Sequence, residues 1–461
     1  MGINNCPNCL ELQRKLDQRD EEILRLRSAL GRKKRQEKEG LFGSSTPSAK
    51  LPVKPNTPEQ EEKGKPGARP GHKGAGRKRG QGEPDRPVIE ISPESECCPI
   101  CGGELRDKGH EDREVLESRP VKVERIVYRL PKKYCPHCRK THRTKAPEVL
   151  PRSLYGNQLI ANAAVMHYLN GIPMGRICEQ TGVGPGSLVE MFHRLAHLFD
   201  AVPDRLIEEY RKAPVKHADE TGWRTNGKNG YAWLFATPEL SVFQFGKSRS
   251  AKVPQAVFGN QPQPGVLVVD RYNGYNKMPC EIQYCYAHLL REITDLEKDF
   301  PENPEIKTFV STTAPMLSLA MGLRTQDISD KQFYKKARKL KKDIQAAMES
   351  PARHLAIRRI QDIFTEKEER LFHWAKDRRV PADNNLAERD LRPSVIARKT
   401  SFGSITDAGA KTRSVLTSVL CSMKKRSQDV SAALKVALDQ MAGDIHQDPF
   451  PLLFPRPAPN H

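Results

Sequence analysis

The order of short strands and helices after residue 215 constrains the fold more than any other feature of this sequence. Runs rich in β-branched and aromatic residues are separated by turn residues, which predicts strands, and they give way to runs with helical spacing. The expected order is strand, strand, strand, helix, strand, helix, strand, helix. The strands are expected at 215–219, 231–236, 241–245, 266–269 and 282–286, and helices are expected around 251–258 and at 288–299.

This order is that of an RNase H-like core, in which the first and fourth strands are neighbours. Asp219 ends the first strand and Asp270 ends the apolar, fully buried fourth strand, so we expect both carboxylates at one edge of the sheet. A third carboxylate from a later helix would complete a set of hard oxygen ligands that suits Mg²⁺ or Mn²⁺. Aspartate at a strand end is also a common turn former, and periodicity does not single out one helical glutamate.

Two Cys-x-x-Cys pairs precede this region, Cys98 with Cys101 and Cys135 with Cys138. Paired spacing of this kind presents four thiolates to one tetrahedral Zn²⁺ in a closed, structural site; reduced structural cysteines are the alternative. A strand is expected between the pairs, at 121–128, because apolar residues alternate there. A third pair, Cys6 and Cys9, cannot complete a site by itself.

The charge of the chain favours a polyanionic partner. Its 461 residues carry 77 Lys and Arg against 57 Asp and Glu, a formal charge of +20, which is typical of nucleic-acid binding and also of a merely basic protein. The segment 32–87 is rich in Gly, Pro and basic residues and cannot bury a core. Its run Arg77, Lys78 and Arg79 could follow DNA phosphates, or the segment could be a solubilising linker.

Helical segments are expected before the basic linker and after the cysteine module. At 1–31, Cys9, Leu16, Ile23 and Leu30 recur every seven residues, which predicts a short coiled coil and at least a dimer; a solvated charged helix is the alternative. At 153–212, helices at 173–180 and 187–199 around a Gly-rich turn are typical of a helix-turn-helix, although such pairs are common in helical domains. Ser187 with Glu190 predicts a capping box.

Three motifs carry a family resemblance: His217-Ala218-Asp219-Glu220-Thr221-Gly222-Trp223, Asp270-Arg271-Tyr272-Asn273-Gly274-Tyr275, and the segment from Asn384 to Pro393. With the zipper, linker and cysteine module, they resemble the acidic-triad (DDE) transposases of the bacterial insertion sequence sixty-six family. The resemblance implies that Asp219, Asp270 and Glu388 bind two Mg²⁺ or Mn²⁺ ions. It further suggests supporting roles for His288, Arg291, Asn385 and Arg392, and DNA contacts for Arg398 and Lys399.

The expected protein is a multidomain α/β transposase with an RNase H-like core and a helical insertion. It would bind the terminal inverted repeats of an insertion element, hydrolyse phosphodiester bonds at the element ends and transfer the 3′ ends to target DNA. Accessory proteins of the same element are further expected partners. With no export signal and no apolar run long enough to span a bilayer, a cytoplasmic, nucleoid-associated location is expected. The alternatives are a catalytically silent zinc-finger repressor and a nuclease that does not join DNA.

The expected domains follow one another along the chain. They are a coiled coil (1–31), a basic linker (32–87), a zinc-finger module (88–152), a helix-turn-helix-like region (153–212), the first part of the core (213–299), a helical insertion (300–380), the second part of the core with C-terminal helices (381–445), and a Pro-rich, disordered tail (446–461).

Overall fold

The computed structural model describes residues 11–12, 14–16, 18–19, 21–23, 26, 123–136, 139–143 and 145–455. By its contacts the chain divides into two units, and every described residue belongs to the unit formed by 1–48 and 122–461. No helix in the described residues is long and apolar enough to cross a membrane.

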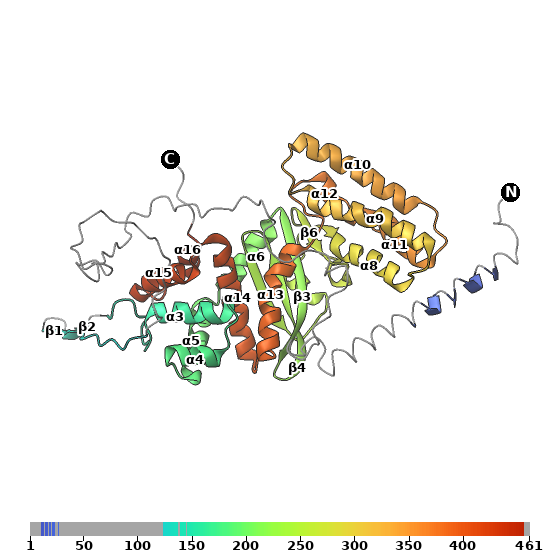
Figure 1. Cartoon of the computed structure of the whole chain (residues 1–461). Coiled ribbons are helices and arrows are strands. Elements are labelled where there is room, and N and C mark those ends of the chain that lie inside the picture. Colours follow the sequence, from blue (N-terminus) through green and yellow to red (C-terminus); the bar gives the residue numbers. More distant parts are fainter. Residues whose placement is uncertain are drawn as a thin grey trace, which may run out of the picture. The chain divides into compact units, whose positions relative to one another are not determined.

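A five-stranded mixed sheet forms the centre of this unit (Figure 1). Its order is β5-β4-β3-β6-β7; β3, β4 and β5 are antiparallel, whereas β6 and β7 run parallel to β3. The five strands confirm the strands expected from the sequence. They are β3 (Val215–Thr225), β4 (Lys228–Ala236), β5 (Ser241–Gly246), β6 (Val266–Val269) and β7 (Glu281–Tyr284).

The β3–β4 hairpin is longer than expected. The strands continue to a two-residue turn at Asn226 and Gly227, whose φ angles of 52° and 69° are those of the type I′ turn that suits the twist of a hairpin. Between β6 and β7 the expected helix is wrong, because the segment forms only a short 3₁₀ turn, η5 (Asn273–Tyr275). Helix α7 (Lys252–Phe258) lies where expected.

Helices cover both faces of the sheet. On one face, α13 (Asn385–Ser401) packs its Ala387 and Leu391 against Leu234 of β4. On the other face, Phe235 packs against Tyr210 of α6 (Val202–Lys212), within a core that also includes α7 and α8 (Tyr286–Asp299). Figure 1 shows α13 running along β3.

Helix α14 (Asp407–Arg426) covers the free edge of the sheet through three serines spaced four residues apart. The Ser422 and Ser418 hydroxyls accept hydrogen bonds from the amides of Ser241 and Phe243 on β5, at 3.0 and 2.8 Å, and Ser414 donates to the Phe243 carbonyl. Side chains of one helix thus satisfy the backbone groups that an edge strand otherwise leaves unpaired.

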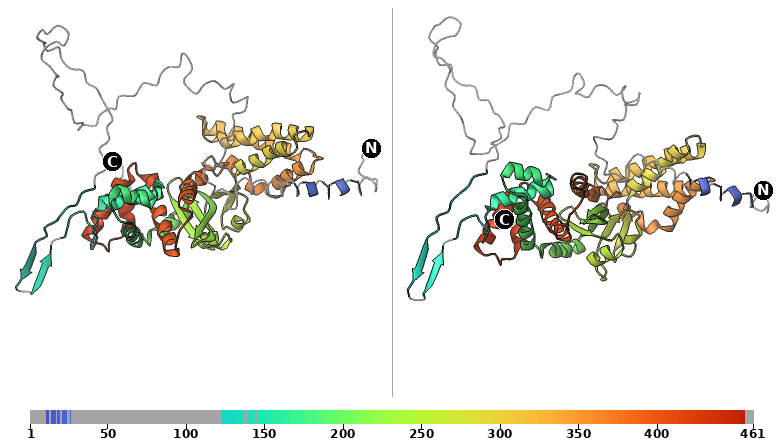
Figure 2. Two further views of the ribbon diagram at one scale, coloured as in Figure 1. Left: turned by 60° about the horizontal axis from the view of Figure 1, so that its bottom comes forward. Right: turned by 90° about the horizontal axis from the view of Figure 1, so that it is seen from below.

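The helical region before the sheet packs against α14 and α15 (Val430–Gly443), as two further views show (Figure 2). The expected helix pair is present, but the capping box is wrong: the second helix begins at Pro185 with Gly184 as its N-cap and no side-chain cap. Proline suits the first helical position, so it moves the start two residues upstream of Ser187. Besides α6, the region contains α3 (Asn157–Ala164), a π-helical segment η4 (Val165–Leu169), α4 (Met174–Thr181) and α5 (Pro185–Leu198).

The segment expected as a helical insertion is helical. Its elements are α9 (Pro304–Leu323), α10 (Asp330–Glu349), α11 (Leu355–Glu366), η6 (Glu368–Arg370) and α12 (His373–Lys376). It contacts the sheet at β7, where Gln283 accepts from the Trp374 amide and donates to the Leu371 carbonyl. The insertion therefore packs on the strand beside the one that ends at Asp270.

Two expectations near the ends of the chain are wrong. The described residues 123–131 form no strand, and the hairpin of the cysteine module lies later, as β1 (Lys132–Cys135) and β2 (Lys140–Arg143). The tail is ordered over 449–453 as α16 (Pro449–Leu453), because Phe450, Leu453 and Phe454 bury apolar surface.

The described residues between 11 and 26 are helical. Leu12, Leu16, Ile23 and Leu26 are exposed on them, so the coiled coil remains a prediction.

Candidate functional site

Asp219 and Asp270 lie on neighbouring parallel strands. Val215 pairs with Val266 and His217 pairs with Val268, so the same register continued for two residues brings Asp219 opposite Asp270. Asp219 also pairs with Leu234, whose side chain packs on α13, and this places the Asp219 carboxylate on the α13 face of the sheet.

Glu388 lies in the first turn of α13, on the helix that runs along β3. Asp270 and Glu388 both act electrostatically on Asp219. The pKa of Asp219 is raised to about 7, first by burial, then by the neighbouring charge of Glu220, and further by the charges of Asp270 and Glu388. The structure thus brings Asp270 and Glu388 within electrostatic reach of Asp219.

The donor atoms of this site suit a divalent cation. Carboxylate oxygens are the ligands that Mg²⁺ and Mn²⁺ prefer. Burial is the main cause of the raised pKa of Asp219, and the charges of Glu220, Asp270 and Glu388 add to it. Asp219 and Asp270 each accept a hydrogen bond from a backbone amide, of Glu220 and Tyr272, at 2.8 and 3.0 Å. Among the described residues, no three His, Cys, Asp or Glu side chains lie close enough together to hold an ion in this arrangement.

Two nearby acidic residues are excluded from the site by their contacts. Glu220 lies on the opposite face of β3, where Arg249 and the Tyr275 hydroxyl bind its carboxylate at 2.7 and 2.6 Å. Asp390 turns away from Glu388 and binds Lys425 at 2.5 Å and the Ser241 hydroxyl at 2.8 Å.

Asn384 connects the start of α13 to the strand that carries Asp219, a role that the sequence motif containing it did not suggest. Its side-chain amide donates to the Ala218 carbonyl and contacts His217 Nδ1, both at 2.9 Å. Its backbone amide donates to Cys285 Sγ. An Asn before a helix usually caps that helix, yet this one makes no cap hydrogen bond. Nothing in the sequence pattern indicates that this side chain binds β3 instead of capping α13.

The supporting residues suggested by the resemblance lie on α8 and α13. His288 is in the first turn of α8, and its Nδ1 atom is buried without a hydrogen-bond partner in the described part of the chain. Arg291 is exposed one turn later. On α13, Asn385 and Arg392 are both exposed, and neither contacts Glu388 through a hydrogen bond in the described structure.

The residues expected to contact DNA differ in their surroundings. Arg398 donates to the Gly222 carbonyl at 2.7 Å and to the Thr221 hydroxyl at 3.2 Å, so it fastens the end of α13 to β3. Lys399 is exposed. Arg77, Lys78 and Arg79 lie outside the described residues, as do Cys98, Cys101 and Cys138 and the side chain of Cys135.

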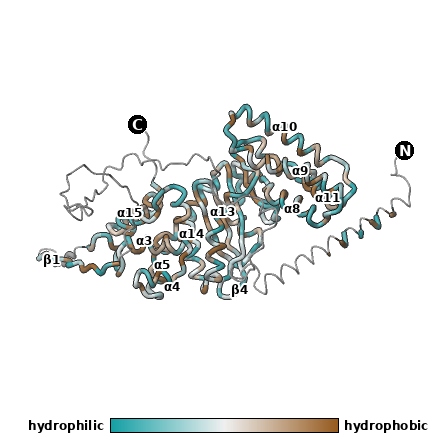
Figure 3. The backbone as a smooth tube through the Cα atoms, in the orientation of Figure 1, coloured by the Kyte–Doolittle hydropathy of each residue, from teal (hydrophilic) through white to brown (hydrophobic). Residues whose placement is uncertain are grey.

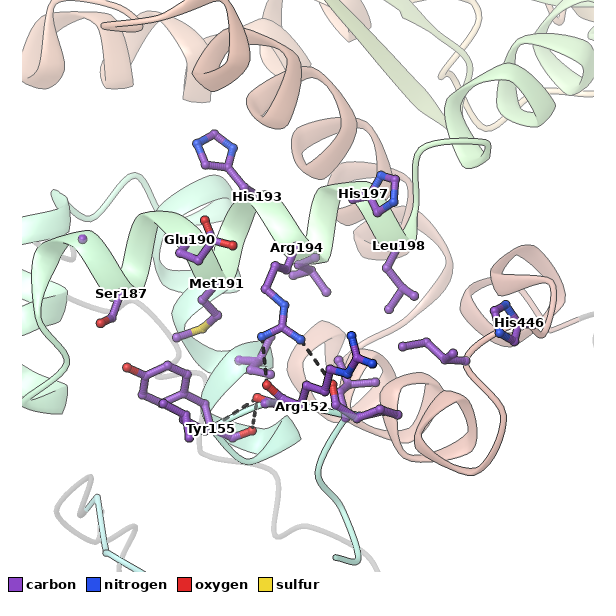
Figure 4. Close-up of a pocket in the computed structure, with 18 residues that line it drawn as sticks. Arg152, Tyr155, Ser187, Glu190, Met191, His193, Arg194, His197, Leu198 and His446 are labelled. Carbon is purple, nitrogen blue, oxygen red and sulfur yellow. Dashed lines mark hydrogen bonds between the residues drawn. The ribbon is translucent and has the colours of Figure 1, made fainter. Parts of the chain in front are cut away.

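A separate cavity of about 930 Å³ lies along α5, away from the carboxylates (Figure 4). Arg194 of α5 spans it and donates to the carbonyls of Pro151 and Arg152 at 3.2 and 3.1 Å. Ser187, Glu190 and Met191 line it from the same helix. Arg194 therefore connects α5 to the segment that follows the cysteine module.

The comparisons with known proteins agree with the sequence motifs. The model of the Transposase IS66 family matches residues 152–412, which is more than half of the chain. The chain belongs to this family. A second model, the zinc-finger binding domain of transposase IS66, matches residues 95–139 and spans two of the cysteine pairs, Cys98 with Cys101 and Cys135 with Cys138. This IS66 transposase therefore carries the family's zinc-finger domain.

Two relatives are proteins of Sinorhizobium fredii (strain NBRC 101917 / NGR234). The uncharacterized protein y4qI is 24% identical over 400 residues, covering 77% of this chain and 72% of that protein. The uncharacterized protein y4hP is 21% identical over 412 residues, covering 78% and 72%.

Proposed function

We propose that this IS66-family chain is an acidic-triad transposase that cleaves the ends of an insertion element and joins the 3′ ends to target DNA. The observation that carries the proposal is that Asp270, after the neighbouring strand β6, and Glu388, on the helix along β3, both act electrostatically on Asp219. The strand order β5-β4-β3-β6-β7 with its mixed directions supports an RNase H-like core.

Asp219, Asp270 and Glu388 would hold two Mg²⁺ or Mn²⁺ ions. When bound, such ions activate a water or a DNA 3′-hydroxyl and stabilise the leaving oxygen. The protein's own part is positioning. β3 and β6 fix the two aspartates in register, and Asn384 at one end of α13 and Arg398 at the other hold the Glu388 helix against β3.

DNA recognition would fall to the modules before the sheet. The exposed face of α5, with Ser187, Glu190 and Arg194, is our candidate for contact with base edges of the terminal inverted repeats, and the zinc finger would add to it. The exposed apolar residues of the N-terminal helix support pairing of two protomers through a coiled coil. We place the protein in the bacterial cytoplasm, at the nucleoid, because its substrate is DNA.

Strand transfer with pre-cleaved element ends and Mg²⁺ tests the carboxylates. Asp219→Asn, Asp270→Asn and Glu388→Gln should each lower joining by at least ~100-fold, since each removes a charged ligand from the metal site. Asp390→Asn is the matched control: it removes a carboxylate from the same helix on the side away from the site, and should retain joining if the protein folds.

The same assay also distinguishes a transposase from a nuclease that does not join DNA and from a repressor. Joining retained by any triad variant contradicts the metal-site assignment. Cleavage without joining by the wild type favours a nuclease, and binding to element ends without either reaction favours a repressor.

A further inference from the structure

Helix α10 of the insertion has two opposite faces. Its buried face is an apolar stripe of Phe333, Ala337, Leu340, Ile344 and Met348, which packs against α9, α11 and α12. Its exposed face is strongly cationic. Figure 3 shows hydrophilic and hydrophobic segments alternating along this helix, and the sequence places six exposed Lys or Arg residues between 331 and 342.

Four of these cations form one row. Lys331, Lys335, Arg338 and Lys342 follow each other at spacings of four, three and four residues, so they share one face of the helix. With a rise of 1.5 Å per residue, the row is roughly 16 Å long. One strand of duplex DNA carries a phosphate about every 3.4 Å along the axis, so the row spans the backbone of about five nucleotides.

The charges in this row are not neutralised by the protein. None of the four residues forms an ion pair with a carboxylate in the described part of the chain, and Arg338 only donates to the carbonyl of Tyr334 on its own helix. Like charges three or four residues apart destabilise a helix. The buried stripe offsets this cost in the free protein, and an anionic partner would remove it.

We propose that the cationic row of α10, defined as Lys331, Lys335, Arg338 and Lys342, binds the phosphate backbone of duplex DNA. The proposal rests on the proposed transposase function, which supplies DNA as the partner. An anionic membrane is the less suitable partner, because α10 carries no exposed large hydrophobic residue that would anchor it in lipid. The contact would be independent of base sequence, since lysine and arginine recognise phosphate charge here.

The test measures binding of the full-length chain to a random-sequence duplex in EDTA, so that no cleavage occurs, over a range of salt concentrations. The variant Lys335→Gln, Arg338→Gln, Lys342→Gln should bind at least ~10-fold more weakly at 0.1 M salt, and the slope of log K against log salt should fall by up to about 2.7. Its thermal midpoint should not fall, because the substitutions relieve repulsion.

The matched control is Lys307→Gln, Arg353→Gln, Lys376→Gln, which removes three exposed positive charges from the same insertion outside α10. It should retain the wild-type slope. The proposal would be overturned by an unchanged slope in the α10 variant, or by an equal loss of DNA binding in the control. It would also be overturned if the α10 variant lost binding to phosphatidylserine vesicles but kept its binding to DNA. The binding assay involves no catalysis. If the triad variants still joined DNA, the metal-site assignment would fail, but the DNA-binding result for α10 would still hold.

Discussion

His167 is a buried histidine whose surroundings require it to be neutral. Its Nδ1 contacts the Ile172 carbonyl at 2.9 Å, and its Nε2 faces the buried guanidinium of Arg413 at 2.8 Å. Burial and, secondarily, Arg413 lower the pKa of His167 to about 4. Arg413 also lies over the rings of Tyr168 and Trp223, so this one contact connects η4, α14 and the end of β3.

We predict that the free energy of unfolding falls as the pH is lowered from about 6.5 toward 4. In this range the unfolded chain binds a proton at His167 and the folded chain does not, which favours unfolding by up to roughly 3 kcal/mol. His217, with its pKa also lowered to about 4 by burial, acts in the same direction. Urea unfolding at pH 7 and pH 5 measures the change.

His167→Gln should show a smaller difference between the two pH values than the wild type. His446→Gln, which removes an exposed ring, is its control and should retain the full difference. A wild-type pH dependence in His167→Gln would show that this histidine is not the group responsible.

Residues of the site were predictable to unequal degrees. Asp270 follows a short apolar run that is typical of a buried strand, and Asp219 was placed by the predicted meander of three strands. Glu388 came from the motif resemblance alone, because helical periodicity is the same for every exposed glutamate. The sequence did not predict that Asn384 and Arg398 hold α13 against β3. Both side chains donate to main-chain carbonyls of β3, and no pattern of side chains reveals such contacts.

At the scale of elements, the serines of α14 explain how β5 ends the sheet. Ser418 is fully buried and accepts from the Phe243 amide, so its hydroxyl takes the place of a neighbouring strand. Without it, this amide would be buried and unpaired, which costs free energy.

We predict that Ser418→Ala lowers the free energy of unfolding by about 1–3 kcal/mol, because a buried amide loses its acceptor. Thermal or urea unfolding measures this. Ser311→Ala is the control: this exposed serine of α9 donates only to a carbonyl of its own helix, and its removal should change stability little. Equal stabilities of the two variants would show that the Phe243 amide finds another partner.

The strands and most helices followed from local patterns, whereas their ends did not. The β3–β4 hairpin extends beyond the predicted strands because the Asn226-Gly227 turn supports further pairing. Helix α5 starts at Pro185 because proline takes the first helical position ahead of the serine cap. The segment 123–131 alternates like a strand but forms no strand, since alternation alone does not supply a neighbouring strand.

For the whole molecule, the family models match a zinc-finger domain at residues 95–139 and a transposase domain at residues 152–412. The finer division of the chain into domains remains a prediction. The packing of α14 against both β5 and α5 was not predictable, because these two elements lie far from α14 in the sequence.

We predict that the purified chain holds about one Zn²⁺ ion, bound by the paired cysteines of the finger domain. Cys101→Ser and Cys138→Ser should each lower the zinc content measured by atomic absorption, because a closed site needs four ligands. Cys178→Ser, in α4, is the control and should keep its zinc. An equal zinc content in all three variants would contradict a four-thiolate site.

The contacts of α13 and α14 with the sheet also set the order in which the protein can mature. Hydrogen bonds join His217 to Asn384 and Ser241 to Ser422, which are 167 and 181 residues apart. A ribosome adds ~5–20 residues per second, so the edge of β5 waits roughly 10 s or longer for its covering helix. The edge of β5 is therefore covered only once α14 has been synthesised, and until then the Ser241 and Phe243 amides lack their serine acceptors.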